Sequence, residues 1–243
     1  MPAGTEPMIA VADVPPSLSG GHLFGTDSLG RDLSARTLMG GRMSLLVGIV
    51  STLVSLIIGI AYGATAGFLG GRVDRVMMRI VDILYALPFM FLVILLMVLF
   101  GRNIVLIFVA IGAINWLDMA RIVRGQTLGL KQREFIEAAR VSGVKSGRII
   151  LRHILPNSLG PVIVAATIDV AAAIIAESTL SFLGLGFPPD IPTWGRILYD
   201  GRDYMDLAVH WAMFPGLAIF LTVLTINFIG DGLRDALDPR RVL

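Results

Sequence analysis

The sequence predicts an all-α polytopic membrane protein, because its composition and the spacing of its charges both depart from those of soluble domains. Hydrophobic residues make up 55% of the 243 residues and charged residues only 16%, against about 25% charged residues in a typical soluble domain. The mean hydropathy is +0.79. A bilayer core about 30 Å thick requires roughly 20 apolar residues in a helix. Several windows of the chain that long carry no Asp, Glu, Lys or Arg.

Five membrane spans are expected, three of them from these charge-free windows and two from apolar stretches that contain charged residues. They cover residues 43–71, 83–101, 103–123, 155–176 and 211–230. The third span places Asp118 and Arg121 near an interface, and the fourth contains Asp169. The alternative is a set of buried helices in a large soluble core, but five such windows in one chain favour membrane insertion.

Basic residues predict the orientation of the spans, because cytoplasmic loops are enriched in Lys and Arg. Placing the basic loop 118–156 in the cytoplasm puts 14 of the 20 Lys and Arg residues inside, together with a cytoplasmic tail at 231–243. Residues 1–41 then form an extracytoplasmic segment before a transmembrane domain at 42–230, with an outer loop at 178–210. No signal-peptide pattern opens the chain. Because residues 1–41 would lie outside the membrane with no span before them, we expect that a first span is missing.

Small residues and intramembrane polar residues indicate how the spans pack. Gly59, Gly63, Gly67 and Gly71 recur every four residues, which predicts close helix packing, within the chain rather than against a partner subunit. Pro88 predicts a kink, because it lacks a backbone donor. An intramembrane carboxylate faces protein or water by default. Asp169 therefore either lines a pathway or makes a structural bond to a neighbouring helix.

The basic loop contains a predicted short amphipathic helix followed by a glycine. Its residues are Glu134, Phe135, Glu137, Ala138, Ala139 and Arg140, and Gly143 is the expected helix end, since glycine accepts the left-handed conformation. A second short helix is expected over 146–153, before Pro156 begins the next span. The first helix can lie on lipid or dock on a soluble partner. Its short length and flanking glycines favour docking.

Four motifs give this chain a specific resemblance. The pattern Glu137-Ala138-Ala139, Gly143 and Leu155-Pro156 resembles the EAA loop of ABC-importer permeases, with His153 where that family often has isoleucine. The stretches 24–45 and 230–239 resemble the GTDxxGRD…SL and GDxLRDxLDP signatures of C-type dipeptide, oligopeptide and nickel permeases. Glu177, Pro188, Pro189 and Trp194 match their outer-loop motif, and Glu177 is expected at the membrane interface.

The resemblance implies a type I ABC-importer transmembrane domain, a fold with six spans in that family, in the plasma (inner) membrane of a prokaryote. It implies one half of a pathway for dipeptides or oligopeptides, paired with a second homologous permease. Two ABC ATPase subunits would bind ATP and Mg²⁺, contact the EAA loop, and leave this chain without a cofactor or catalytic role of its own. An extracytoplasmic substrate-binding protein would deliver the solute. Nickel chelate, glutathione or another small solute is the alternative cargo.

Several other functions are excluded or disfavoured by the residues themselves. No Walker A loop and no HExxH or GxSxG set is present. A net charge of +2 argues against a nucleic-acid partner, and the absence of cysteine excludes thiolate metal sites. The three histidines are scattered along the chain, which disfavours a metal site. A self-sufficient secondary transporter would use Asp169 but requires internal repeats, which we do not find. An intramembrane enzyme is also disfavoured, because it requires polar residues that converge within the spans.

Overall fold

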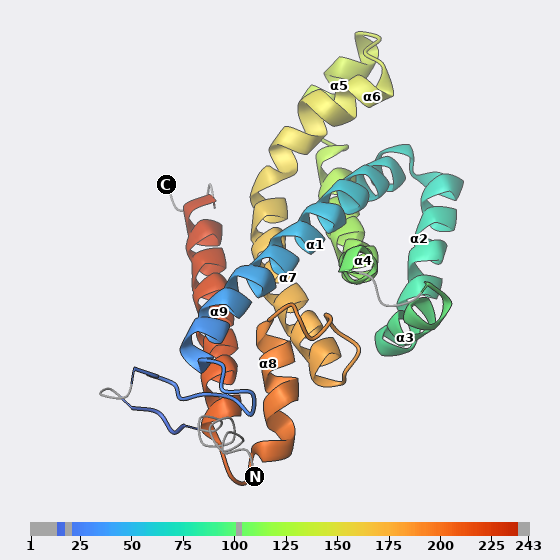
Figure 1. Cartoon of the computed structure of the whole chain (residues 1–243). Helices are drawn as coiled ribbons and strands as arrows, with labels where there is room; N and C mark the ends of the chain where they lie inside the picture. Colours follow the sequence, from blue (N-terminus) through green and yellow to red (C-terminus); the bar gives the residue numbers. More distant parts are fainter. Residues whose placement is uncertain (1–13, 18–20, 101–103, 238–243) are drawn as a thin grey trace, which may run out of the picture.

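The computed structural model describes residues 14–17, 21–100 and 104–237, and its regular elements are helices (Figure 1). The helices α5 and α6 lie at one end of the molecule, and α8 lies at the other with the segment before α1. The elements in chain order are α1 (Leu33–Leu69), α2 (Gly71–Tyr85), α3 (Phe89–Phe100), α4 (Ile104–Leu130), α5 (Glu134–Val141), α6 (Ser146–Ile149), a π-helical turn (Ile150–Ile154), α7 (Leu155–Phe182), α8 (Trp194–Gly201), a 3₁₀ turn (Arg202–Tyr204) and α9 (His210–Leu237).

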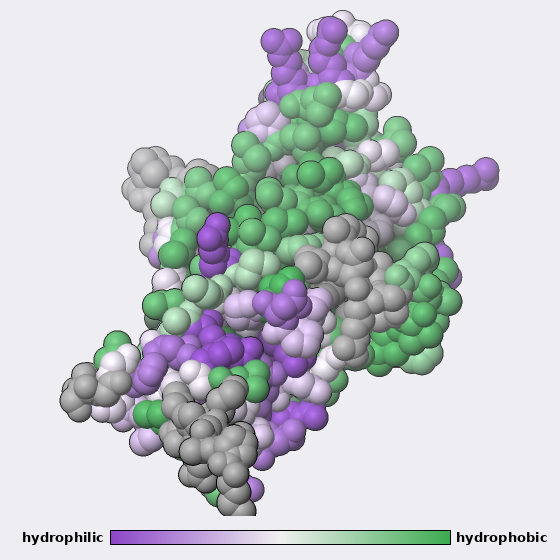
Figure 2. Space-filling model, viewed as in Figure 1, coloured by the Kyte–Doolittle hydropathy of each residue, from purple (hydrophilic) through white to green (hydrophobic). Residues whose placement is uncertain are grey.

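Three of the described helices are long and apolar enough to cross a bilayer. They are α1, the continuous helix Ser146–Phe182 and α9. Figure 2 shows an apolar band across one face of the molecule, between more polar surfaces at its two ends. This arrangement agrees with a helical bundle that sits in a membrane and exposes a polar surface on each side.

Helix α1 begins ten residues before the expected span. Asp32 caps it, since the Ala35 backbone N–H donates to Asp32 Oδ1 at 2.9 Å. Arg36 lies in the first turn and is buried in ion pairs. The charge-free window starts after Arg42, which is exposed and does not end the helix. The helix therefore continues well beyond the apolar window, to a length of about 55 Å at 1.5 Å per residue.

The expected span over 83–101 is divided in two. The amphipathic helix α2 ends at Tyr85, and Pro88 lies in the break before α3. The prediction of one kinked helix is therefore wrong, because the chain leaves the helical path here. Arg124 and Arg121 on α4 hold α2, with Arg124 Nη2 2.7 Å from Asp74 Oδ2.

The second short helix expected over 146–153 is instead the start of the long helix that contains α7. The π-helical turn Ile150–Ile154 joins α6 to α7 directly before Pro156. A widened turn gives room to a proline ring, which would otherwise collide with the preceding turn. The Asn157 side chain donates to the His153 carbonyl oxygen at 2.6 Å. The proline is therefore accommodated without a break in the helix.

The packing of α1 on α4 rests on the predicted small-residue face. A Cβ atom added to Gly59 would lie 2.6 Å from Met119 Cβ, and one added to Gly63 would lie 2.3 Å from the Ala120 carbonyl oxygen. The prediction of packing within the chain is thus confirmed for these glycines. Gly71 is not on this face, since it begins α2 with a φ of 59°.

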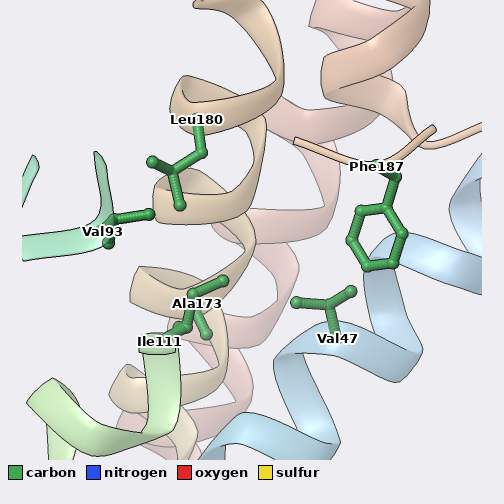
Figure 3. Packing of buried hydrophobic residues seen from close by; sticks show 6 residues of the cluster. All are labelled: Val47, Val93, Ile111, Ala173, Leu180 and Phe187. Atoms are coloured by element: carbon green, nitrogen blue, oxygen red, sulfur yellow. The ribbon is translucent and has the colours of Figure 1, made fainter. Parts of the chain in front are cut away.

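A hydrophobic cluster holds together the part of the bundle next to the loop before α8 (Figure 3). It joins α1, α3, α4 and α7 to the loop after α7 through buried aliphatic and aromatic side chains. Its members are Val47, Val93, Ile111, Ala173, Leu180 and Phe187. The loop that leads to α8 is therefore anchored in the core of the bundle.

Candidate functional site

The end of the molecule that carries α8 contains a network of ion pairs. Asp27, in the segment before α1, accepts hydrogen bonds from Arg31 Nε at 2.7 Å and Arg36 Nη1 at 2.6 Å. The other arm of Arg36 donates to Asp200 on α8 at 2.9 Å, and Arg196 lies 3.0 Å from the same carboxylate. These contacts tie the segment before α1 to α8.

The buried carboxylate of Asp27 is stabilised in its charged form. Burial by itself would raise the pKa of Asp27, but hydrogen bonds from the backbone and side chain of Arg31, together with the charge of Arg36, lower it below its ordinary value. Asp27 and Arg36 expose only 4% and 9% of their side chains. The network is therefore a fixed structural element rather than a pair of surface charges.

The predicted outer-loop residues Glu177 and Trp194 meet beside α1. Glu177 is completely buried, so its expected interfacial position is corrected. Thr193 and Ser181 donate to Glu177 Oε1 at 2.7 and 2.6 Å, which satisfies one oxygen of the carboxyl group inside the protein. The Trp194 indole N–H donates to the Thr37 carbonyl oxygen at 2.8 Å. This residue pair locks the start of α8 against α1 and α7.

The two predicted prolines shape the loop between α7 and α8. Pro188 is half-buried, and its carbonyl oxygen accepts a hydrogen bond from the Ile191 backbone N–H at 3.1 Å. Pro189 is exposed and lines a small cavity of about 300 Å³ next to Asp27 and Asp200. The structure therefore brings the outer-loop motif and the ion-pair network together at one end of the bundle.

A larger cavity of about 1200 Å³ opens among α4, α7 and α9. Asp169 lines it from α7, and Ser55 Oγ on α1 donates to Asp169 Oδ2 at 2.9 Å. Both readings of Asp169 thus have support, since the carboxylate reaches a cavity and also bonds to a neighbouring helix. Pro88, the other candidate pathway residue, lies away at the exposed break between α2 and α3.

The short helix expected in the basic loop is confirmed as α5. Gly143 ends it with a φ of 76°. The Gly143 N–H donates to the Arg140 carbonyl oxygen at 2.9 Å, and the Val144 N–H donates to that of Ala139 at 3.1 Å. These two bonds form a Schellman motif, in which a glycine in the left-handed conformation satisfies the last carbonyl groups of a helix.

Helix α5 is held on one side and free on the other. Ile136 is buried against Phe68, Ile149 and Ile154, and the Arg140 guanidinium carbon lies 4.9 Å from the centre of the Phe68 ring. Phe135 is 43% exposed. The opposite face, at i, i+3, i+4 and i+7 spacing, is exposed and consists of Glu134, Glu137, Ala138 and Val141. The bundle thus presents this face at its end.

Some residues of these sites were not singled out from the sequence. Arg36 and Asp200 are separated by more than 160 positions, and no local pattern connects them. Ser55 lies in a span with other hydroxyl residues and had no distinguishing neighbour. Arg234 lies in the tail motif, but only the fold shows that it lines the cavity with Asp169. Asp238 and Pro239 of that motif lie outside the described residues.

Comparisons with known proteins agree with this geometry. Residues 59–242 match the family model described as binding-protein-dependent transport system inner membrane component. The chain is 56% identical over 225 residues to the oligopeptide transport system permease protein OppC of Haemophilus influenzae, across 93% of this chain and 72% of that protein. It is 48% identical over 230 residues to the dipeptide transport system permease protein DppC of Bacillus subtilis, across 94% of this chain and 71% of that protein.

Solved structures show the same fold. An inward-facing conformation of the MetNI methionine ABC transporter contains a chain that aligns with a TM-score of 0.70 at 21% identity, over 85% of this chain and 98% of the other. The helical arrangement of this chain is therefore shared with a chain of that transporter.

Proposed function

Because this chain belongs to the family of binding-protein-dependent transport system inner membrane components, we propose that it is a permease subunit of an ABC importer for short peptides. The observation that carries the proposal is its similarity, over nine-tenths of its length, to permease proteins named for oligopeptide and dipeptide transport. The chain contributes half of the pathway, and a second homologous permease contributes the other half.

The exposed face of α5 is the proposed docking surface for an ATPase subunit. This face presents two carboxylates, Glu134 and Glu137, next to the small Ala138 and the 90% exposed Val141. Its buried side is fixed through Ile136 to the helix that becomes α7. Movement of a docked partner would therefore pass directly into a helix that crosses the membrane.

Besides this chain, the proposed importer contains the second permease, two ATPase subunits and a binding protein. Two ATPase subunits bind and hydrolyse ATP with Mg²⁺, so this chain is a non-catalytic subunit that holds no cofactor. An extracytoplasmic binding protein delivers the peptide at the end that carries α8. The complex lies in the plasma membrane of a prokaryote, with the C-terminus of this chain in the cytoplasm, an orientation supported by the distribution of Lys and Arg.

Affinity purification from native membranes followed by uptake measurements tests this proposal. We expect a second permease and ATPase subunits to co-purify, and the complex in proteoliposomes to take up labelled peptide only with ATP and the binding protein. Isolation of the chain alone, together with uptake driven by a proton gradient without ATP, would favour a secondary transporter and contradict the proposal.

A matched pair of variants tests the docking surface. Val141→Asp places a charge in the exposed face of α5, and we expect it to abolish retention of the ATPase subunits. Val209→Asp places the same charge at an exposed position before α9, at the opposite end of the chain's long helices. It should retain them. Equal retention by the two variants would show that the α5 face is not the contact.

A further inference from the structure

We propose that the cavity among α4, α7 and α9 binds a short peptide through both of its charged ends, with the ammonium group at Asp169 and the carboxylate at Arg234. This inference rests on the proposed function and adds to it a site and a ligand length. Both residues line the same cavity of about 1200 Å³. They come from different helices and carry opposite charges.

The charges of the cavity favour a zwitterion over a simple anion or cation. Its lining contains the carboxylates of Asp118 and Asp169 and three guanidinium groups. Arg121 is already engaged, since its Nη2 lies 3.0 Å from Asp82 Oδ1 and its guanidinium carbon 4.3 Å from the Tyr85 ring centre. Within the described part of the chain, the other two, Arg133 and Arg234, form no ion pair. Two carboxylates and two available guanidinium groups thus remain.

Contacts between α7 and α9 establish which residues lie at the same level. A Cβ atom added to Gly160 would lie 3.7 Å from Leu237 Cβ, and one added to Gly230 would lie 2.5 Å from Thr167 Oγ1. The residue number rises by seven on α7 while it falls by seven on α9. The helices are therefore antiparallel, and equal steps along them in opposite directions keep residues level.

This alignment gives the distance between the two proposed contacts along the helix axis. Arg234 precedes Leu237 by three residues and so lies level with residue 163 on α7. Asp169 is six residues further on, which corresponds to about 9 Å at 1.5 Å per residue. An extended chain spans at most about 3.3–3.6 Å per residue. A tripeptide, about 10 Å from end to end, fits this separation.

The cavity wall between the two charged residues consists of apolar side chains. Val164, Ala165 and Ile168 line it between the levels of Arg234 and Asp169. The cavity exceeds the roughly 300–1,000 Å³ of ordinary small-molecule pockets. The site therefore reads the two termini, which all short peptides share, and leaves room for side chains of different sizes.

The bond between Ser55 and Asp169 offers a way to separate ligand binding from a structural role. Ser55 Oγ donates to Asp169 Oδ2, and within the described chain Oδ1 accepts no hydrogen bond, so it is available to an ammonium group. Asp169→Asn keeps an oxygen for Ser55 and removes only the charge. Ser55→Ala removes the hydrogen bond and keeps the charge. If Asp169 binds the ligand, Asp169→Asn should weaken peptide binding more than Ser55→Ala does. If Asp169 is only structural, Ser55→Ala should have the larger effect.

Calorimetric titration of the purified, nucleotide-free importer complex without binding protein tests the site. The ligands are Ala-Ala-Ala, its N-acetylated form and its C-terminal amide. We expect each blocked peptide to bind the wild type at least about tenfold more weakly, as is typical of a lost hydrogen bond between charged groups. Asp169→Asn should abolish discrimination against the acetylated peptide, and Arg234→Gln discrimination against the amide. Ser55→Ala and the exposed control Arg79→Gln should retain both.

Equal binding of the three peptides to the wild type would overturn the proposal. So would unchanged discrimination in Asp169→Asn, or loss of discrimination in Ser55→Ala to the same degree. ATP-driven uptake is measured in parallel on the same complex after reconstitution into proteoliposomes and addition of ATP and the binding protein. A complex that imports peptide but does not discriminate between these ligands refutes the site alone, whereas absence of ATP-driven import refutes the proposed function.

Discussion

Gly63 lies where α1 packs tightly against α4, and its replacement by alanine is a direct test of this packing. A Cβ atom at this position would lie 2.3 Å from the Ala120 carbonyl oxygen and 3.0 Å from the Arg124 backbone nitrogen. Both are backbone atoms of a neighbouring helix, so no flexible side chain can move aside. The two helices must instead separate by about 1 Å to restore ordinary van der Waals contact.

The expected cost follows from two opposing effects. Overpacking of a well-packed interior costs about 1–3 kcal/mol, and the rigid backbone obstacle places Gly63→Ala at the upper limit. Alanine is favoured over glycine inside a helix by about 0.5–1 kcal/mol, which offsets part of that cost. The net loss should be about 2 kcal/mol, or roughly 4–8 °C in melting temperature for a chain of this size.

Gly125→Ala is the matched control on α4. A Cβ atom there would meet nothing within 4 Å, so only the gain in helix propensity remains, and the variant should be as stable as the wild type or slightly more stable. Melting of both variants is followed by tryptophan fluorescence in one detergent. The reasoning is refuted if Gly63→Ala melts at the wild-type temperature, or if Gly125→Ala is destabilised to the same extent.

Three further perturbations give expected outcomes. Gly143→Ala strains a residue at φ 76° by about 1 kcal/mol, and it should lower peptide taken up per ATP hydrolysed while leaving membrane insertion intact. Arg36→Gln breaks a buried ion pair and should destabilise the protein by about 3 kcal/mol, whereas the exposed Arg202→Gln should change its melting temperature little. Hydrogen bonds, the strongest from Ser34, lower the pKa of Asp32 to about 2. Because this folded pKa lies below the unfolded one, the cap stabilises fully above about pH 4 and is lost as the pH falls toward 2, a dependence that should be weaker for Asp32→Asn in melting curves.

Local sequence signals were reliable where one segment sufficed to determine its own structure. The apolar windows identified the apolar parts of α1, α7 and α9, since a helix of about 20 apolar residues needs no partner to define it. Gly143 ended α5 as expected, because the Schellman motif depends only on neighbouring residues. The start of α1 was misplaced because the exposed Arg42 ends the charge-free window but not the helix, which begins directly after the Asp32 cap.

The candidate sites show the same division. Glu177 appeared interfacial because a carboxylate near the end of a span is usually solvated, but Thr193 from the following loop buries and satisfies it. Asp169 could be recognised as unusual in the sequence, although its cavity could not. The cavity forms only when α4, α7 and α9 pack together.

The sequence by itself determined that the chain is helical, enters a membrane and carries an EAA loop, because hydropathy, glycine conformation and motif spacing act over short stretches. Only the tertiary structure decided which charges face one another. Asp27, Arg36 and Asp200 form one network, and Asp169 and Arg234 line one cavity. The physical reason is that electrostatic interactions depend on distance in space, and helix packing brings together residues that lie far apart in the chain.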